Sequence, residues 1–148
     1  MTYSFNGSSK YQEISVNTSS PTRLVVMLYE GTIKFLQQAI DATQRKDFVQ
    51  KSRSVDRAVA IIQHLQGTLD IEKGQDVAKE LDRLYTYMGS RIFEGSAKLD
   101  CTAFQEVVKL LGTLLSGWEQ VALKEQEQTV PTDWLAKQGD TGRFELHA

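Results

Sequence analysis

Apolar residues recur at steps of three and four along most of the chain, which is the period of an amphipathic helix. The only two prolines, Pro21 and Pro131, bracket more than a hundred residues that carry this pattern. Proline breaks the interior of a helix but suits its first position. The pattern therefore predicts four helices, over about residues 21–44, 47–69, 75–99 and from 100 onward. Their apolar stripes include Leu24, Leu28, Phe35, Phe48, Val55, Ile62, Leu69, Val77, Leu81, Tyr85, Met88, Phe104, Leu111 and Trp118.

Capping residues mark the starts of these segments. Ser20 precedes Pro21 and reads as an N-cap, and Asp100 reads as the cap of the last helix. Asp47 is followed three residues later by Gln50, the spacing of a capping box. The stretch 70–74 is expected to be a loop, in which Gly74 can adopt the positive φ that a turn needs.

Short connections between the helices predict antiparallel neighbours. The predicted fold class is all-α, an antiparallel up-down four-helix bundle with flexible N- and C-terminal segments. We expect residues 1–19 to be a flexible N-terminal segment, 20–130 the four-helix bundle and 131–148 a mobile C-terminal tail. Within that tail, Trp134 and Leu135 are expected to dock back on the bundle.

The first helix carries apolar residues beyond a single stripe. Val26, Tyr29, Ile33 and Ile40 form a second apolar set. A helix that is apolar on two sides needs a cover on both. The candidates are the N-terminal segment, with Tyr11 and Ile14, and a partner protein. Glycines inside the predicted helices favour shallow grooves that accept extra helices. These glycines are Gly31, Gly89, Gly95, Gly112 and Gly117.

Composition excludes several classes of protein. The formal net charge of −2 is atypical of proteins that neutralise nucleic-acid phosphates. A single cysteine, Cys101, cannot form an internal disulfide, and residues 1–10 hold no apolar run of the kind found in signal peptides. No apolar run approaches the roughly 20 residues that span a bilayer. We expect a cytoplasmic protein without membrane insertion and without a nucleic-acid partner.

The sequence lacks the residue patterns of a catalytic or metal site. The two histidines, His64 and His147, have no glutamate three residues before them, as the di-iron sites of helical bundles require. One cysteine and two histidines make zinc ligation within the chain improbable. Gly-Lys-Ser/Thr, the end of a phosphate-binding loop, does not occur. We therefore predict no enzymatic activity, no cofactor and no metal.

Three blocks of residues, in order, resemble the FliS family of flagellar export chaperones. Tyr11-Gln12 lies ahead of the helices; Ser20-Pro21 leads into Met27-Leu28-Tyr29-Glu30-Gly31; and Leu69-Asp70-Ile71-Glu72-Lys73-Gly74 leads to Leu84-Tyr85-Thr86-Tyr87-Met88 and Arg91. The resemblance covers about residues 11–120. The chain departs from the family at Glu30, where Asp is usual, at Gln75, where a second Gly is usual, and at Ser96, where Asn is frequent. It also has Gly89 and Ser90 where the family commonly has bulkier or basic residues.

The resemblance implies a function. FliS-like proteins bind the C-terminal segment of flagellin in the cytosol, block its premature polymerisation and assist its delivery to the flagellar type III export apparatus. The implied partners are this segment and the export gate. We expect a monomer or weak homodimer, although the sequence does not give the oligomeric state. By motif match, the residues expected to bind the client are Tyr11, Gln12, Tyr29, Tyr85, Tyr87, Met88 and Arg91. For Tyr85 and Met88, a pure core role is equally compatible with the pattern.

Three alternatives stay open at this point. One is a helical-bundle adaptor that binds a different flagellar subunit or regulator. The second is an enzyme built on a bundle, which the lack of paired carboxylates and histidines disfavours. The third is a coiled-coil assembly protein, which the short connections disfavour.

Overall fold

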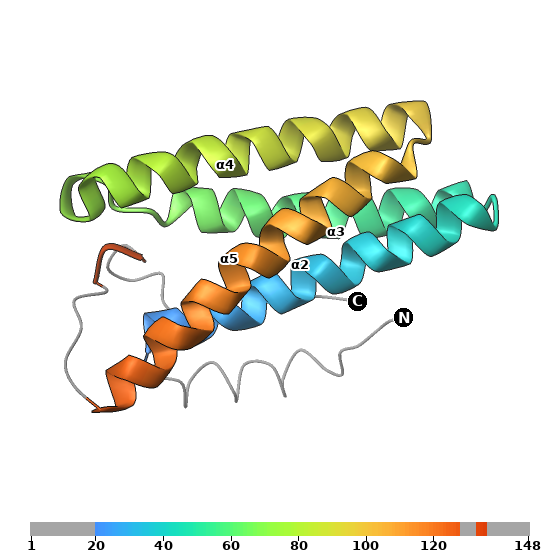
Figure 1. Ribbon diagram of the computed structural model, residues 1–148. Coiled ribbons are helices and arrows are strands. Elements are labelled where there is room, and N and C mark those ends of the chain that lie inside the picture. The colour runs from blue at the N-terminus through green and yellow to red at the C-terminus, as the bar shows by residue number, and fades with distance from the viewer. Residues whose placement is uncertain (1–19, 128–132, 136–148) are drawn as a thin grey trace.

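The computed structural model describes residues 20–127 and 133–135 and confirms an antiparallel bundle of four helices. These are α2 (Pro21–Gln44), α3 (Phe48–Gly67), α4 (Ile71–Lys98) and α5 (Cys101–Glu127). A short 3₁₀ helix, η1 (Asp133–Leu135), follows them. Successive helices run in opposite directions, and α5 crosses the others obliquely (Figure 1). The predicted docking of Trp134 and Leu135 is confirmed, because Leu135 is buried in the main core.

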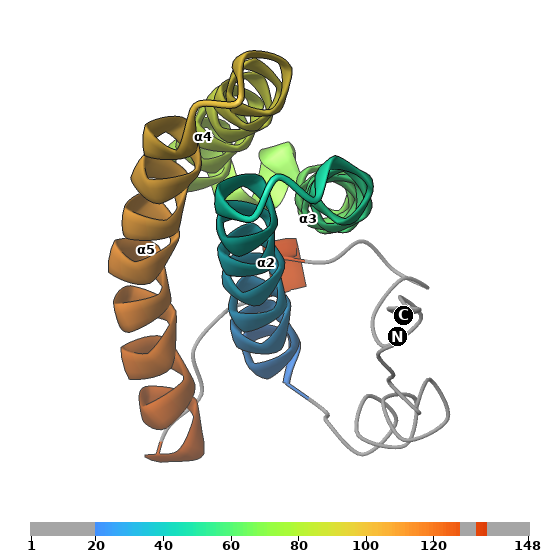
Figure 2. The same cartoon turned by 90° about the vertical axis from the view of Figure 1, so that its right-hand side faces the viewer.

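The four helices are not equivalent in their packing. Viewed from its end, the bundle has α2 between α3 and α5, while α4 lies over the top of the group (Figure 2). α2 accordingly packs against both α3 and α5, whereas α4 packs less extensively on those same two helices. α2 is thus the central helix, and α4 is the one held least closely.

This arrangement explains the second apolar set of α2. Val26 and Tyr29 are buried within the molecule, while Ile33 and Ile40 are partly buried against the core. Because α3 and α5 cover two sides of α2, these residues do not require a partner protein as a cover. Two residues predicted in the stripes are instead exposed. Phe48 is the first residue of α3, at one end of the bundle, and Val77 follows an interruption of α4 that shifts its apolar phase.

The predicted caps hold, with one correction. The Ser20 side chain accepts a hydrogen bond from the Arg23 amide, and Asp47 accepts one from the Gln50 amide. The reciprocal half of the predicted capping box is wrong. The Asp47 amide donates to the Ala42 carbonyl, and the Gln50 side chain donates to Ser54 Oγ. The Asp47 amide is the donor that the capping box would have used, and it is already bonded to the preceding turn.

The segment 70–74 is the largest departure from the sequence-based expectation. It is not a loop but the first turn of α4, capped by Asp70, whose side chain accepts from the Lys73 amide. The positive φ falls on Gln75 (φ 51°, ψ −125°) rather than on Gly74. A side chain is strained in this conformation, which glycine adopts freely. Gln75, one of the positions at which the chain departs from the resembled family, is thus a position where glycine fits the backbone better.

A buried pair of tyrosines joins two helices across the middle of the bundle. Tyr29 of α2 and Tyr85 of α4 share a hydrogen bond of 2.7 Å between their hydroxyls, and their rings meet edge to face with centroids 6.4 Å apart. Burial raises the pKa of Tyr29 and raises that of Tyr85 well above its usual value. Both hydroxyls are therefore held neutral, each serving as the other's partner.

Replacing Gln75 by glycine should stabilise the bundle by about 1 kcal/mol, because glycine adopts the positive φ without a clash of its own β-carbon. Urea denaturation would measure the gain. Gln75→Ala is the matched control: it keeps the β-carbon and should give no comparable gain. Equal stabilisation by both variants would show that the backbone at residue 75 is not the cause.

The free energy of unfolding should fall as the pH rises above about 10. The pKa of each of these tyrosines is higher in the folded protein than in the unfolded chain, so the unfolded chain ionises first as the pH rises. The contribution of the neutral pair to stability is therefore complete below about pH 10 and is lost above it. Each buried tyrosine contributes a slope of up to about 1.4 kcal/mol per pH unit. Denaturation from pH 8 to 11 should show a shallower fall for the double variant Tyr29→Phe/Tyr85→Phe. An unchanged slope would contradict this assignment.

Candidate binding site

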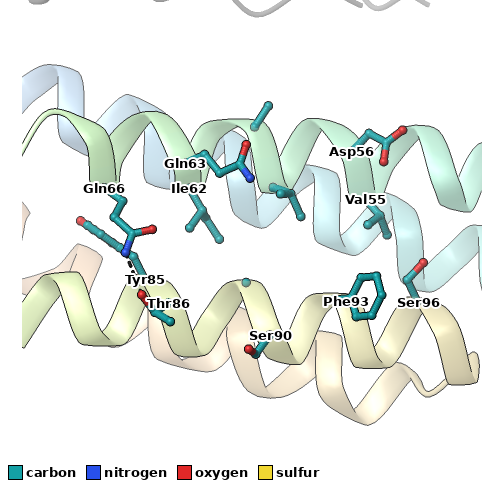
Figure 3. A pocket seen from close by; sticks show the side chains of 13 residues that line it. Val55, Asp56, Ile62, Gln63, Gln66, Tyr85, Thr86, Ser90, Phe93 and Ser96 are labelled. Carbon is teal, nitrogen blue, oxygen red and sulfur yellow. Dashed lines mark hydrogen bonds between the residues drawn. The ribbon is translucent and has the colours of Figure 1, made fainter.

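An open groove of about 740 Å³ lies between α3 and α4. Val55 and Ile62 point from α3 toward α4, and Phe93 rises from α4 toward α3 (Figure 3). Tyr85 lines the same groove beside Thr86. The groove exists because α4 packs less closely on α3 than α2 does.

Polar contacts tie the two walls together near each end of the groove. At one end, the Gln66 side chain of α3 donates to Thr86 Oγ1 (2.7 Å) and to Asp82 Oδ1 (2.9 Å) of α4. At the other, the buried Lys51 ammonium of α3 donates to the carbonyl (3.1 Å) and hydroxyl (2.9 Å) of Ser96. A cation near the C-terminus of α4 also complements the dipole of that helix. The walls are therefore pinned at two places and separated between them.

The middle of the groove is apolar and unfilled. Phe93 is 75% exposed, an unusual exposure for a phenylalanine. A β-carbon added to Gly89 would meet no atom within 4 Å. Burying a phenylalanine side chain contributes about 1.5–3 kcal/mol. The groove is thus suited to receive apolar side chains from a helix or extended segment.

A smaller hollow of about 390 Å³ lies between α2 and α5, away from this groove. Met27 and Glu30, from the motif at residues 27–31, line it, as does Leu123, an exposed leucine of α5. Nearby, Glu125 accepts hydrogen bonds from the hydroxyls of Ser20 (2.6 Å) and Thr22 (2.9 Å). This carboxylate ties α5 to the start of α2.

The residues predicted to bind a client occupy three different places. Tyr11 and Gln12 lie outside the described residues. Tyr85 lines the groove. Tyr29 lies behind Tyr85 and is fully buried, at 0% exposure. Met88 is likewise 0% exposed. As the bundle stands, Tyr29 and Met88 have no surface to offer another molecule, and their side chains fill the core.

Tyr87 and Arg91 lie on the side of α4 that faces α5, not in the groove. The Tyr87 hydroxyl and Arg91 Nε (2.7 Å) both donate to the Glu106 carboxylate, and Arg91 also pairs with Glu94 at 2.7 Å. Hydrogen bonds from Tyr87 and Arg91 lower the pKa of Glu106, so this carboxylate is ionised at neutral pH. The motif 84–91 therefore contributes to two faces of α4 at once.

Most residues that line the groove were not singled out by the sequence. Val55, Ile62 and Gln66 belong to α3, whose pattern gave only a buried stripe. The signal that did point here was the departure from the family at Gly89 and Ser90, both of which line the groove. Phe93 was also detectable, since it falls outside the stripe of its helix.

Across 20–127 and 133–135, no group of three or more His, Cys, Asp or Glu side chains is placed to hold a metal ion. In the same part of the chain, no helix combines the length and apolar character needed to cross a membrane.

Comparison with known proteins identifies the family. The family model described as flagellar protein FliS matches residues 4–126. A flagellar secretion chaperone FliSB of Pseudomonas aeruginosa is 34% identical over 124 residues, which are 81% of this chain and 98% of the relative. Flagellar secretion chaperones FliS of Salmonella typhimurium and Bacillus subtilis are 32% and 30% identical, each over 82% of this chain and over 94% and 90% of their own lengths. The chain therefore belongs to the FliS family of flagellar proteins.

Proposed function

We propose that this protein is a cytoplasmic export chaperone that binds the disordered C-terminal segment of flagellin and keeps it from polymerising until export. The observation that carries the proposal is the open apolar groove between α3 and α4, in a chain whose relatives are named flagellar secretion chaperones. The chaperone would act by binding alone, without catalysis, and would present the bound subunit to the flagellar type III export apparatus.

The physical logic is that of folding coupled to binding. A segment that is disordered alone loses about 2–5 kcal/mol of interaction energy to ordering when it binds. It therefore needs a large apolar contact surface. The groove supplies exposed Phe93 and the space above Gly89, and the hollow between α2 and α5 supplies Met27 and Leu123. A client that runs across both would gain from each, in the helix-in-groove mode of recognition.

We propose separate roles for the predicted client residues. Tyr85, almost fully buried, forms part of the floor of the groove beneath the client, and Tyr29 holds the Tyr85 ring in place through their shared hydrogen bond. Tyr87 and Arg91 form a second, charged surface with Glu106 on the other side of α4. This surface is available to the client or to the export gate. Met88 supports both faces from the core.

Filling the groove should weaken client binding strongly. In Gly89→Leu, the new side chain would occupy the open space above the α4 backbone, so apolar side chains of the client are excluded. We expect calorimetric titration with about the last forty residues of the organism's flagellin to show at least about a hundredfold weaker binding, the loss of roughly 2.7 kcal/mol. For the unmodified protein, a negative heat-capacity change should accompany binding.

Gly117→Leu is the matched control for this experiment. Like Gly89, Gly117 is a helical glycine with no atom within 4 Å of an added β-carbon, but it is exposed and lies on α5 outside the groove. This variant should bind as the unmodified protein does. Equal affinity of all three proteins would place the client elsewhere on the bundle. No binding by the unmodified, folded protein would favour a different flagellar subunit or regulator as the client.

Deleting residues 1–16 should raise the affinity for the client. We propose that this segment, through Tyr11 and Ile14, competes with flagellin for the apolar groove, so that its removal increases the fraction of binding-competent protein. An increase of about threefold would follow if the segment covers the groove two thirds of the time. Replacing residues 1–16 by a Gly/Ser sequence of equal length is the control for chain length and should give the same increase. Unchanged affinity in both would exclude the competition.

A further inference from the structure

The helix η1 attaches the C-terminal part of the chain to the junction of α3 and α4. The Asp70 amide donates a hydrogen bond of 2.8 Å to the Trp134 carbonyl. Asp70 is also the N-cap of α4. η1 therefore holds the residue that caps α4, and it packs against both α4 and α2 (Figure 1).

Two side chains anchor η1 firmly. Leu135 is only 3% exposed and belongs to the main core. The Trp134 ring lies so close to Gly74 that an added β-carbon there would come within 2.8 Å of it, and it lies 6.0 Å from the Trp118 ring between centroids. Gly74, which the sequence suggested for a turn, is thus needed for the close approach of an aromatic ring.

The contacts of η1 fall immediately before the strained residue of α4. Asp70 and Gly74 are held, and Gln75 with its positive φ comes next. Strained backbone persists only where the surrounding structure over-determines it. The anchored turn 71–74 on one side and the packed helix from Ala78 onward on the other provide that constraint. Without η1, the first of these two anchors is weakened.

Those contacts also lie at one end of the groove. The two walls of the groove, α3 and α4, join at residues 68–70, and the nearest polar tie between them is Gln66 with Asp82 and Thr86. At the far end, Lys51 and Ser96 provide the other tie. The direction in which α4 leaves the junction therefore helps to set the distance between the walls.

We propose that Trp134 and Leu135 are positioning residues for the groove: they fix the start of α4 and so preorganise the site for its occupant. They need not touch the client. A preorganised site loses less conformational freedom on binding. Loss of this preorganisation should therefore appear mainly as faster dissociation of the occupant. The part of this inference that concerns affinity rests on the proposed function, whereas the part that concerns α4 does not.

Hydrogen exchange of the full-length protein tests the part that concerns α4. In Trp134→Ala, amides of residues 71–82 should exchange at least about tenfold faster, while Trp134→Phe should restore most of the protection. Ile40→Ala is the control. It removes partly buried apolar surface at the opposite end of the bundle and should leave residues 71–82 protected. Unchanged exchange in Trp134→Ala, or an equal increase in Ile40→Ala, would overturn the proposal. If Trp134→Ala does not fold, Leu135→Ala gives the same comparison.

Titration of the same variants with the flagellin C-terminal segment tests the link to the groove. Trp134→Ala should bind about fivefold more weakly, with faster dissociation, while Trp134→Phe and Ile40→Ala should lie within twofold of the unmodified protein. Unchanged or tighter binding by Trp134→Ala would overturn the positioning role; tighter binding would mean that the client displaces η1. If the unmodified protein does not bind this segment, the proposed function fails, and the exchange result alone decides whether η1 fixes the start of α4.

Discussion

The hydrogen bond between Tyr29 and Tyr85 is the contact on which the rest of the structure depends. It joins α2, the central helix, to α4, the least closely packed one, in a buried environment where an unpaired hydroxyl would be costly. Tyr85 shares the inward side of α4 with the buried Leu81, Met88 and Ile92, and this inward side decides what the other sides present. Gly89 and Phe93 then line the groove beside α3, and Tyr87 and Arg91 face Glu106 of α5.

A groove remains beside this contact because the ties between α3 and α4 are polar and few. Lys51 and Gln66 hold the walls at two separated places, and the apolar surface between them is left without a partner. Filling the space between the walls at their present separation would require larger side chains where Gly89 and Ser90 stand. Because α4 has few contacts with α3, it depends on other parts of the chain for support. We assign this support to η1 and to the tyrosine pair.

Periodicity and caps were enough to predict the bundle, because each helix has one strong stripe and a recognisable start. The helix α2 begins and ends where the pattern placed it, at Pro21 and Gln44. The groove was beyond such reasoning. Whether Phe93 lies under a neighbouring helix or in the open depends on the spacing of α3 and α4, which no local pattern encodes. For the same reason, the sequence could not show which residues of the motif at 84–91 lie on which face of α4. The only sign of the strain at Gln75 was that the family usually has glycine at this position.

Four of the five departures from the family, all except Glu30, lie on α4. Gly89 and Ser90 remove side-chain volume from the wall of the groove, and Gln75 strains the turn from which that wall starts. Interiors of complexes are packed as densely as protein cores, so an empty space above Gly89 disfavours any client that does not fill it. A flagellin segment matched to a bulkier wall would leave a void here and lose dispersion contacts on both sides of it. If a client folds into this groove as proposed, its best-fitting segment would carry a large apolar side chain opposite residue 89.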